Sequence, residues 1–339
     1  MLGSVKAVFK KTLAIACLNI AGILTATSAA ADAGLRAQAQ TFFKPLPESM
    51  PGAENDSPAL ISLGEKLYFE TALSINGEQS CNSCHQINNQ GAGVDNNPTS
   101  PGALEGRFGN RNSPSVFNAG FHVAQFWDGR AADLKEKAKG PILNPVEMAV
   151  PDEATAVKRL RKAGYEDAFA KAFPGEDSAL NYDNVAAAIA AFERTLITRD
   201  RFDEFLKGND TALNAQEKQG LKTFISTGCI ACHSGALLGG SMYQKMGSVN
   251  PYANTEDKGR EELTGKASDR YVFKVPSLRD ISRTAPYFHD GAVATLDEAV
   301  KQMAWLQLGR ELSDADTASI VAFLNALENT QPVTLAQAK

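Results

Sequence analysis

The feature that most constrains this chain is a short motif that occurs twice. Residues 80–86 read SCNSCHQ and residues 228–234 read GCIACHS, so each copy has two cysteines, two intervening residues and a histidine directly after the second cysteine. This spacing is the attachment pattern of c-type haem, in which both thiols form thioethers with the porphyrin and the imidazole ligates the iron. We therefore expect two haems, bound through Cys81, Cys84 and His85 and through Cys229, Cys232 and His233.

The use of the cysteines supports this interpretation. The chain has five cysteines, and Cys17 is the only one outside the two motifs. Two alternatives stay open from the residues alone. In an oxidising compartment the paired cysteines could form two disulfides. A zinc site would need more histidine or cysteine ligands than the chain has near either motif.

The first residues are typical of a bacterial secretory signal. Three lysines among the first eleven residues precede an apolar run over residues 13–24, which is followed by the small residues TATSAAA. The apolar run is too short to span a bilayer stably, and no later segment is apolar enough to do so. We expect a signal peptide over residues 1–31, cleaved between Ala31 and Ala33. The mature protein is then exported to the periplasm without stable membrane insertion.

Removal of the signal peptide makes the protein more acidic and leaves enough chain for two domains. The full sequence has a formal net charge of −5, and the loss of three lysines and no acid takes it to −8. An acidic exported protein is a poor candidate for nucleic-acid binding, although its charge suits a basic protein partner. About 308 remaining residues exceed what one compact core usually supports, so two domains are expected.

The apolar residues between and after the motifs recur at helical spacing. Three segments show it: Val185, Ile189, Phe192 and Leu196, with Asp183 as the expected cap; Ile320, Phe323, Leu324 and Leu327, after the capping pair Ser313 and Asp316; and Val157, Leu160, Tyr165 and Phe169, a weaker helix. No run of alternating β-branched residues is long enough for a large sheet. The glycine-rich segments 91–114 and 235–276 are expected to be long loops, either wrapped around a haem or lying on the surface.

Five longer segments make a resemblance to a known family specific. In chain order they read LGEKLYFETALSINGEQSCNSCH, RNSPSVFNAGFHVAQFWDGRAADL, GPILNPVEMA, YVFKVPSLRD and TAPYFHDG. Together they resemble the bacterial di-haem cytochrome c peroxidase family, which includes the MauG-type protein oxidases. The resemblance runs from about Leu60 to Leu324. It implies an all-α enzyme of two cytochrome c-like domains whose haems face the domain interface.

On this resemblance the mature chain divides into two haem domains. The N-terminal, peroxidatic domain is expected over residues 32–205 and the C-terminal, electron-transfer domain over residues 206–339, with the final residues docking back on the first domain. His85 and His233 are the proximal ligands, and the resemblance implies Met303 as the second ligand of the C-terminal haem. A thioether ligand raises the reduction potential, and MauG-type members have a tyrosine here. The alternative for Met303 is simple core packing.

The N-terminal haem lacks the distal histidine that many family peroxidases have. The resemblance places that histidine seven residues before Arg111, where this chain has Leu104, and leucine has no lone pair with which to ligate. Glu105 and His122 are the other candidates, and for His122 a hydrogen bond at a helix–loop junction is favoured over ligation. We expect the His85 haem to be five-coordinate or water-bound when oxidised, ready to react with peroxide without prior reduction.

The resemblance also implies which residues act at this open haem. Glu147 of NPVEM would be the general acid and base that moves a proton between the peroxide oxygens, and Pro141 and Met148 would close the distal pocket. Trp127 of FWDGR would lie between the haems and carry electrons, a role compatible with a buried core aromatic. Lys137 stands where relatives often have glutamine, and its effect on the pocket is left open.

A calcium ion between the domains is implied by the resemblance alone. The matching oxygen donors are the side chain of Asn112 and the main-chain carbonyls of Thr284 and Pro286, and oxygen donors suit Ca2+. His289 is expected to hydrogen-bond a haem propionate and not to ligate iron.

The leading prediction is a periplasmic peroxidase that reduces H2O2 to water with electrons from a small c-type cytochrome or a cupredoxin, and the family favours a homodimer. Two alternatives are kept. A MauG-like oxidase that modifies aromatic residues of a partner protein is favoured by Leu104 and opposed by Met303. A non-enzymatic di-haem electron carrier is opposed by Glu147 and by an open iron, because a carrier gains nothing from a reactive site.

Overall fold

The computed structural model describes residues 31–88, 91–333 and 335. The predicted signal peptide lies, apart from Ala31, outside these residues. Residues 31–40 are helical. The α-helices that follow are α2 (Pro58–Tyr68), α3 (Cys81–Cys84), α4 (Leu134–Leu143), α5 (Glu153–Lys162), α6 (Glu166–Ala172), α7 (Tyr182–Glu193), α8 (Arg201–Leu206), α9 (Ala215–Thr227), α10 (Glu261–Thr264), α11 (Leu296–Leu308) and α12 (Asp314–Asn325). The strands are β1 (Tyr243–Lys245) and β2 (Val272–Lys274), and short 3-10 helices are η1 (Ala53–Asn55), η2 (Thr71–Leu73), η3 (Ala119–Phe121), η4 (Asp210–Ala212), η5 (Cys229–Ala231), η6 (Ala267–Asp269) and η7 (Ile281–Arg283).

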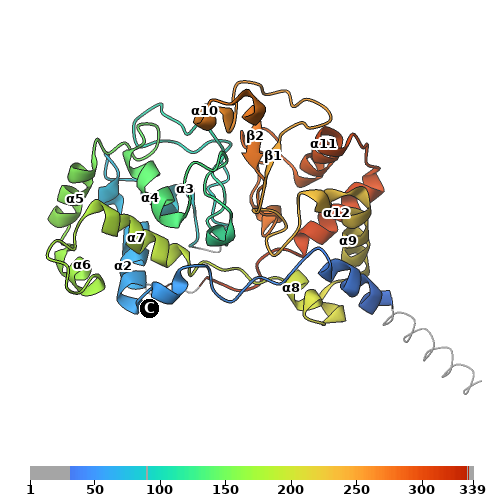
Figure 1. The fold of residues 1–339 in the computed structure, drawn as a ribbon, viewed down its shortest axis with the longest axis horizontal. Helices are drawn as coiled ribbons and strands as arrows, with labels where there is room; N and C mark the ends of the chain where they lie inside the picture. The colour runs from blue at the N-terminus through green and yellow to red at the C-terminus, as the bar shows by residue number, and fades with distance from the viewer. Residues whose placement is uncertain (1–30, 89–90, 334, 336–339) are drawn as a thin grey trace, which may run out of the picture.

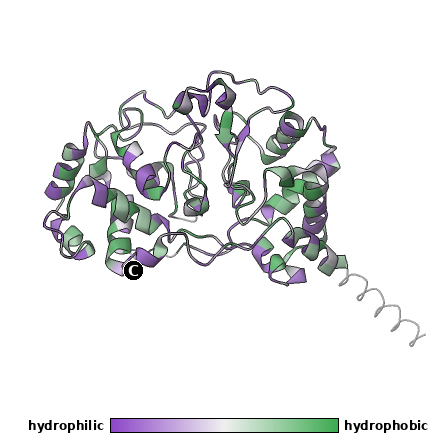
Figure 2. Ribbon diagram, in the orientation of Figure 1, coloured by the Kyte–Doolittle hydropathy of each residue, from purple (hydrophilic) through white to green (hydrophobic). Residues whose placement is uncertain are grey.

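The helices gather in two lobes, which Figure 1 shows on the left and on the right of the molecule. The first lobe contains α2 to α7, and the second contains α8 to α12 together with both strands. In the first lobe, Leu63 and Leu67 of α2 share one buried core with Val185 and Ile189 of α7. The outermost helix of this lobe, α5, is largely hydrophilic (Figure 2).

The start of the described chain packs on the second lobe, and its end packs on the first lobe. Leu35 and Phe43, near the start, are buried in the core of the second lobe with Phe224. Val333 and Leu335, near the end, pack against a buried cluster of the first lobe, and Figure 1 shows the C-terminal end beside α2. Each lobe is therefore completed by a segment from the other end of the chain.

Both lobes contain the same close helix crossing. A Cβ on Gly64 of α2 would lie 1.8 Å from the main-chain oxygen of Ala188 in α7, and a Cβ on Gly220 of α9 would lie 1.8 Å from that of Ser319 in α12. Only a residue without a side chain permits two helix backbones to approach so closely. In each lobe the helix that precedes the cysteine motif thus crosses a later helix at a glycine.

The helix prediction near the C-terminus is confirmed, and one predicted cap is wrong. Ser313 caps α12, its hydroxyl accepting the main-chain N–H of Asp316 at 3.1 Å, and the predicted apolar face of this helix is buried. In α7 the cap is Asn181, whose side chain accepts a main-chain N–H three residues later at 2.8 Å. Asp183 lies instead in the first turn, where a carboxylate still interacts favourably with the helix dipole.

The single helix predicted from Val157 to Phe169 is wrong, because the chain forms two helices there. Val157 and Leu160 lie in α5 and Phe169 lies in α6. Between them Gly164 has a φ of +85°, a left-handed conformation that ends a helix and that glycine adopts without strain. All three apolar side chains still point into or against the core of the first lobe.

The strands β1 and β2 form the one named sheet of the described chain. They are antiparallel, with Tyr243 paired to Lys274 and Lys245 paired to Val272. The fold is thus helix-rich, and the prediction that no large sheet forms is confirmed for the described residues. Segment 235–276 contains both strands and α10, so it is more ordered than the predicted loop, whereas segment 91–114 contains no named helix or strand.

A fully buried ion pair ties α8 to the segment after β2. The guanidinium of Arg279 lies 2.5 Å from a carboxylate oxygen of Asp200 and 2.8 Å from one of Asp203, and all three side chains are buried. The same guanidinium donates to the carbonyl oxygen of Ala236 at 2.7 and 2.9 Å. Because Asp200 also caps α8, this cluster fixes the start of the second lobe against the chain around its cysteine motif.

The glycine crossings make a direct prediction about stability. Gly64→Ala and Gly220→Ala are each expected to lower the free energy of unfolding by about 1–3 kcal/mol or more, because the added methyl group meets a backbone oxygen that cannot rotate away. The matched control is Gly34→Ala in the exposed part of the helix over residues 31–40, where no atom outside that helix lies within 4 Å of an added Cβ. It is expected to raise stability by up to about 1 kcal/mol. Urea denaturation followed by circular dichroism measures all three, and equal effects would contradict the close-crossing interpretation.

Candidate functional site

The second cysteine motif opens on one cavity, which is lined mostly by the second lobe and partly by residues of the first lobe. Cys229, Cys232 and His233 come from η5 and the residues after it, Met303 comes from α11, and all four line this cavity. Much of the remaining lining is aromatic or aliphatic: Phe224, Phe273, Leu296, Val300, Ile320 and Leu324. Two thiols, an imidazole and a thioether that face one apolar space fit a c-type haem with histidine and methionine ligands.

A hydrogen bond sets the orientation of the His233 ring. Its Nδ1 lies 2.9 Å from the carbonyl oxygen of Leu238. Because a carbonyl only accepts, Nδ1 carries the proton and Nε2 keeps the lone pair that a metal needs. Burial lowers the pKa of His233, so the ring is neutral, and thus able to ligate, at neutral pH.

The first motif lies on a short helix and is anchored in a similar way. α3 contains both of its cysteines, and His85 follows directly. The Tyr68 hydroxyl donates to the carbonyl oxygen of His85 at 2.5 Å, and His85 Nδ1 lies 3.4 Å from the carbonyl oxygen of Gly93. Burial, assisted by the charge of Lys137, lowers the pKa of His85 to about 4. This imidazole is therefore also neutral and able to ligate.

The cysteines of both motifs are free, so the disulfide alternative is wrong. Burial raises the pKa of the Cys81 thiol to about 12 and those of Cys84 and Cys229 to about 11. Such thiols stay protonated and are poor nucleophiles and poor metal ligands. Within residues 31–88 and 91–333, no three His, Cys, Asp or Glu side chains gather to hold a metal ion, which leaves the zinc alternative without support. Each motif thus presents two free thiols beside a histidine, which is the set of groups that thioether attachment of haem requires.

Glu147 lies half-buried beside the first motif. Its Oε1 accepts the side-chain N–H of Asn144 at 2.8 Å, and its charge contributes to the raised pKa of Cys84. Burial raises the pKa of Glu147 itself, against the opposing effects of Arg130, Asn144 and Lys137. A carboxyl group whose pKa is moved towards neutrality is suited to both accepting and donating a proton.

The other two residues predicted for this pocket lie next to Glu147. Met148 is buried in the core of the first lobe, and its main-chain N–H donates to the carbonyl oxygen of Pro141 at 3.2 Å. Pro141 lies inside α4, close to the end of this helix. Both residues thus fix the turn that carries Glu147, and Met148 packs mainly against apolar side chains.

The loop in which a distal histidine was considered lies over the same turn. Ala103 donates its main-chain N–H to the carbonyl oxygen of Glu147 at 2.7 Å. Leu104 is 43% exposed and Glu105 is exposed as well. Both side chains therefore lie at the surface of this loop, and neither is held in the interior as an axial ligand would be.

Lys137 forms an ion pair that the sequence did not predict. Its ammonium lies 2.5 Å from Oε1 of Glu193 on α7, and Glu193 is 1% exposed. The second carboxylate oxygen of Glu193 is buried without a hydrogen-bond partner among the described residues. The charge of Lys137 acts on both His85 and Glu147, lowering the pKa of each. The only sequence signal for Glu193 is an acid directly after an apolar helical face.

Trp127 lies at the contact between the lobes. Its indole N–H donates to the carbonyl oxygen of Asn112 at 2.8 Å, and Asn112 in turn donates its main-chain N–H to the carbonyl oxygen of His289 at 2.7 Å. The carbonyl oxygen of Trp127 accepts the main-chain N–H of Lys274 at 2.7 Å. Trp127 also lines the cavity of the second motif. These contacts place Trp127 where the two lobes meet, and its position between two haems stays a prediction.

Ion pairs of Arg111 hold this contact together. Arg111 lies next to Asn112 in the first lobe, and its guanidinium contacts Asp257 of the second lobe at 2.6 and 2.7 Å. A third N–H donates to Asp128, beside Trp127, at 2.7 Å. Desolvation opposes the charge of Arg111, but the two carboxylates outweigh it and raise the pKa of the guanidinium. The side chain is therefore a permanent cation that joins the lobes around Trp127.

His289 is buried in the same region, against the cavity of the second motif. Its ring stacks on Phe273 at 4.2 Å between centroids. Its Nε2 is buried and has no hydrogen-bond partner among the described residues, and the closest carboxylate, Asp257, is 3.9 Å away. An orphaned ring nitrogen beside the cavity fits the predicted role of a hydrogen-bonding partner for a haem carboxylate.

The three predicted calcium donors lie along the wall of one cavity, and the calcium site itself stays a prediction. Asn112, Thr284 and Pro286 all line the cavity of the second motif. The Asn112 side chain lies 2.9 Å from the carbonyl oxygen of Asn97, and Asn96 reaches the carbonyl oxygen of Ala285 at 2.7 Å. These hydrogen bonds hold the chain around Asn96 and Asn112 against the segment around Ala285.

The structure places His122 away from the first motif. Its side chain lines the cavity of the second motif, and its Nδ1 lies 2.6 Å from the ammonium of Lys274. The hydrogen-bonding role favoured for His122 over ligation agrees with this position. Lys274 was not singled out from the sequence, where a single lysine in YVFKVP is not distinguishable from a surface residue.

Comparison with known proteins agrees with these two sites. The family model for di-haem cytochrome c peroxidase matches residues 58–211. Over 311 residues the chain is 48% identical to cytochrome c551 peroxidase of Pseudomonas aeruginosa, an alignment that covers 90% of this chain and 89% of the relative. The chain belongs to the di-haem cytochrome c peroxidase family. The family predicted from the sequence is thereby confirmed, and it implies two c-type haems.

Two further matches agree with the family and the fold. The chain is 42% identical over 325 residues to cytochrome c551 peroxidase of Nitrosomonas europaea, which covers 95% of this chain and 93% of the relative. Among solved structures, a MauG-like protein associated with microbial copper homeostasis matches with a TM-score of 0.76 and 27% identity, covering 87% of this chain and 97% of that chain. The prediction of a peroxidase enzyme is confirmed by the sequence relatives.

Membrane insertion was also considered from the sequence. Of the helices that the structure describes, none is both long enough and apolar enough to cross a bilayer.

The buried pair of Lys137 and Glu193 makes a prediction about stability. Lys137→Met is expected to lower the free energy of unfolding by about 3–5 kcal/mol, because it leaves the Glu193 carboxylate buried without its cation. The double variant with Glu193→Met should recover most of this loss. In the control Lys135→Met, which breaks the exposed pair with Asp183, the change should stay within about 1 kcal/mol. Urea denaturation measures the three variants, and a loss no larger than the control would contradict a buried pair.

Proposed function

We propose that this chain is an exported, periplasmic peroxidase that works as a homodimer and reduces H2O2 to water with electrons from a small c-type cytochrome or a cupredoxin. The observation that carries the proposal is the difference between the two motif sites. Met303 lines the cavity of the second motif, whereas Glu147, a half-buried carboxyl group whose pKa is raised by desolvation, lies beside the first. The second site therefore suits electron transfer, and the first suits proton transfer to a small substrate.

Each lobe would hold one haem. Bound haem supplies iron that takes up peroxide oxygen and exchanges electrons. The first haem would be attached at α3 and ligated by His85, and the second attached at η5 and ligated by His233 and Met303. The repeated glycine crossing supports a division into two cytochrome c-like domains over residues 32–205 and 206–339. The packing adds residues 35–43 and α8 to the second domain.

Glu147 would move the proton that peroxide cleavage requires. Its carboxylate accepts a proton from one peroxide oxygen and donates it to the other, which leaves as water. Asn144 holds Oε1 by a hydrogen bond of 2.8 Å, so the second oxygen, Oε2, is the one directed to substrate in this proposal. The exposed Leu104 leaves the first haem without a distal histidine, and we propose that this site is open when oxidised.

Trp127 would carry electrons from the second haem to the first. Its ring is fixed by the indole hydrogen bond to Asn112 and by the flanking ion pair between Arg111 and Asp128. A fixed aromatic ring shortens the distance that an electron must tunnel between two macrocycles. A Ca2+ ion held by Asn112, Thr284 and Pro286 would stabilise the same contact, because Asn112 also carries the Trp127 hydrogen bond.

A second candidate function is a MauG-like oxidation of aromatic residues in a partner protein. The observation in its favour is the exposed Leu104 in place of a distal histidine, together with the MauG-like solved structure. Met303 in the cavity of the second motif opposes it. A pure electron carrier is disfavoured by Glu147, whose raised pKa suits proton transfer.

The proposed function is tested by the peroxide-dependent oxidation of a reduced small c-type cytochrome. Glu147→Gln is expected to slow this reaction by about 10²–10⁴-fold, because the amide cannot transfer the proton. Since burial raises the pKa of Glu147 above its usual value, the wild-type rate should fall as the pH drops through that raised pKa. This fall in rate at low pH (the acid limb of the pH profile) should be absent in Glu147→Gln.

The matched control for this test is Glu136→Gln, which changes an exposed glutamate of α4 and should leave both the rate and the pH profile unchanged. A Glu147→Gln variant that retains full activity and the acid limb would contradict the assigned role. Wild-type protein that carries both haems and oxidises no cytochrome donor would contradict the proposed function itself.

A further inference from the structure

A buried positive charge lies beside the cavity of the second motif without a negative partner. Lys274, the last residue of β2, is 7% exposed. Its ammonium lies 2.6 Å from His122 Nδ1, and in the described part of the chain it forms no ion pair with any carboxylate. Burying an ammonium group away from water is costly unless an anion accompanies it. No carboxylate of the described residues thus balances the positive charge of Lys274.

His122 cannot supply that balance. Its Nδ1 faces the ammonium and accepts a hydrogen bond from it, so the imidazole is neutral. Burial and the charge of Lys274 hold the pKa of His122 well below its usual value. Burial lowers the pKa of Lys274 only to about 8. At neutral pH the pair therefore carries one positive charge.

The pair is held rigidly by its surroundings. The main-chain N–H of Lys274 donates to the carbonyl oxygen of Trp127 at 2.7 Å. On the other side, the His122 ring lies so close to Gly240 that an added Cβ there would be 3.3 Å from it. His122 thus fixes the ammonium at one place, which is the task of a positioning residue.

The cavity itself indicates what the missing anion is attached to. Lys274 and His122 line the same space as Cys229, Cys232 and Met303. The other lysine or arginine in the described lining, Arg279, is already neutralised by two buried aspartates. An occupant must therefore combine an apolar body that bonds to two thiols with an anionic edge that meets Lys274. A c-type haem, with its two carboxylates, has this chemistry.

We infer that Lys274, positioned by His122, binds a carboxylate of the second haem and places a positive charge beside it. This inference rests on the proposed function, because it requires a haem on the second motif. A nearby positive charge favours the reduced state of a haem, since reduction adds an electron. Lys274 thus acts in the same direction as the Met303 thioether, which also raises the potential. The Met303 thioether and the Lys274 ammonium would each make the second haem easier to reduce than the first.

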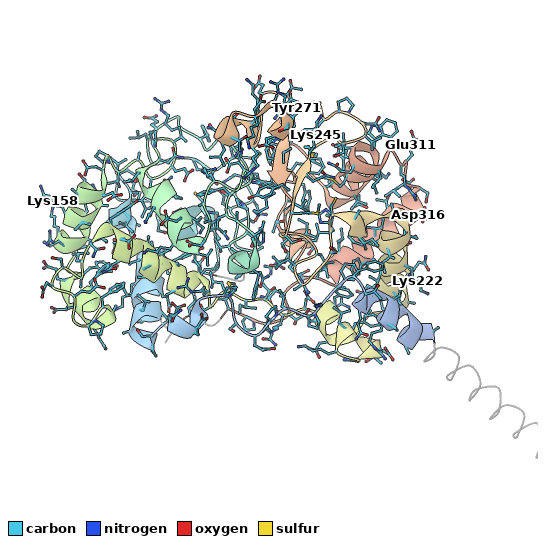
Figure 3. All side chains as sticks on the ribbon, in the orientation of Figure 1. Lys158, Lys222, Lys245, Tyr271, Glu311 and Asp316 are labelled. Carbon is cyan, nitrogen blue, oxygen red and sulfur yellow. The ribbon has the colours of Figure 1, made fainter. Side chains whose placement is uncertain are left out.

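The test is a redox titration of the second haem in the complete two-haem protein, without peroxide. Lys274→Met should lower its midpoint potential, so that the ratio of reduced to oxidised haem at a fixed potential falls by tenfold or more, which corresponds to about 59 mV for one electron. Lys274→Arg keeps the charge and should stay close to wild type. The matched control is Lys245→Met on the paired strand β1, where the side chain is exposed (Figure 3). This control should not move the potential.

A second readout looks at the carboxylate directly. The haem propionate bending mode in the resonance Raman spectrum should shift in Lys274→Met and stay unchanged in Lys245→Met. His122→Leu should shift this mode while lowering the potential less than Lys274→Met does, because the charge remains but is no longer fixed. If Lys274→Met does not accumulate as folded protein, Lys274→Gln gives the same two measurements with a polar side chain.

The outcomes separate this inference from the proposed function. A Lys274→Met protein with both haems attached, an intact methionine ligand, and the wild-type potential and propionate mode would overturn the inference. A wild-type protein without haem on the second motif would instead overturn the proposed function. Haem content by absorption spectroscopy, recorded before each titration, distinguishes the two cases.

Discussion

The contact of Arg111 with Asp257 and Asp128 is the interaction on which the arrangement of the two sites depends. The guanidinium joins a carboxylate of each lobe at 2.6–2.7 Å and is itself largely buried. Replacing one partner would leave a buried charge unpaired, which costs several kcal/mol. The neighbouring Asn112 carries both the Trp127 hydrogen bond and the link to His289. The ring that lies between the two motifs is therefore placed by this one cluster of charges.

The two lobes have the same helix crossing in their separate cores, but the side chains around their cysteine motifs differ in chemistry. Gly64 and Gly220 permit the same helix crossing, and each crossing precedes a cysteine motif. Around the second motif the structure gathers a thioether, a buried ammonium and an orphaned imidazole nitrogen. Around the first it gathers the half-buried carboxyl group of Glu147, whose pKa is raised, and an ion pair between Lys137 and Glu193. In the proposed function, one fold thus provides an environment for electron storage in one lobe and for proton transfer in the other.

The cysteine motifs, the cap of α12 and the candidate acid Glu147 could be predicted from the sequence because each depends on residues that are close together in the chain. The motifs span five residues each, and Ser313 and Asp316 lie one helical turn apart. Glu147 lies only three residues after Asn144, which holds its carboxylate. The break between α5 and α6 and the choice of Asn181 over Asp183 as a cap were missed. The break depends on the backbone conformation of Gly164, and the cap depends on which of several polar residues forms one hydrogen bond. A periodic pattern of apolar residues specifies neither.

The remaining features pair residues that are distant in the chain. Lys137 meets Glu193 and His122 meets Lys274 only after the lobes have folded, and a lysine or a glutamate read alone is typical of a solvated surface. The same holds for the start of the chain, since Leu35 carries no signal for the lobe that it joins, whereas the docking of the final residues on the first domain was implied by the family resemblance. Such contacts are set by tertiary packing, and they are the ones that distinguish the two sites chemically.

The most direct test of the account is an electron paramagnetic resonance spectrum of the fully oxidised protein, recorded before and after addition of peroxide. The account predicts one low-spin haem, ligated by His233 and Met303, and one high-spin ferric haem at His85. It predicts that the high-spin signal disappears on addition of peroxide with no reductant present. Two low-spin signals that do not respond to peroxide until the protein is half-reduced would contradict an open first site, and would mean that another side chain ligates the His85 haem.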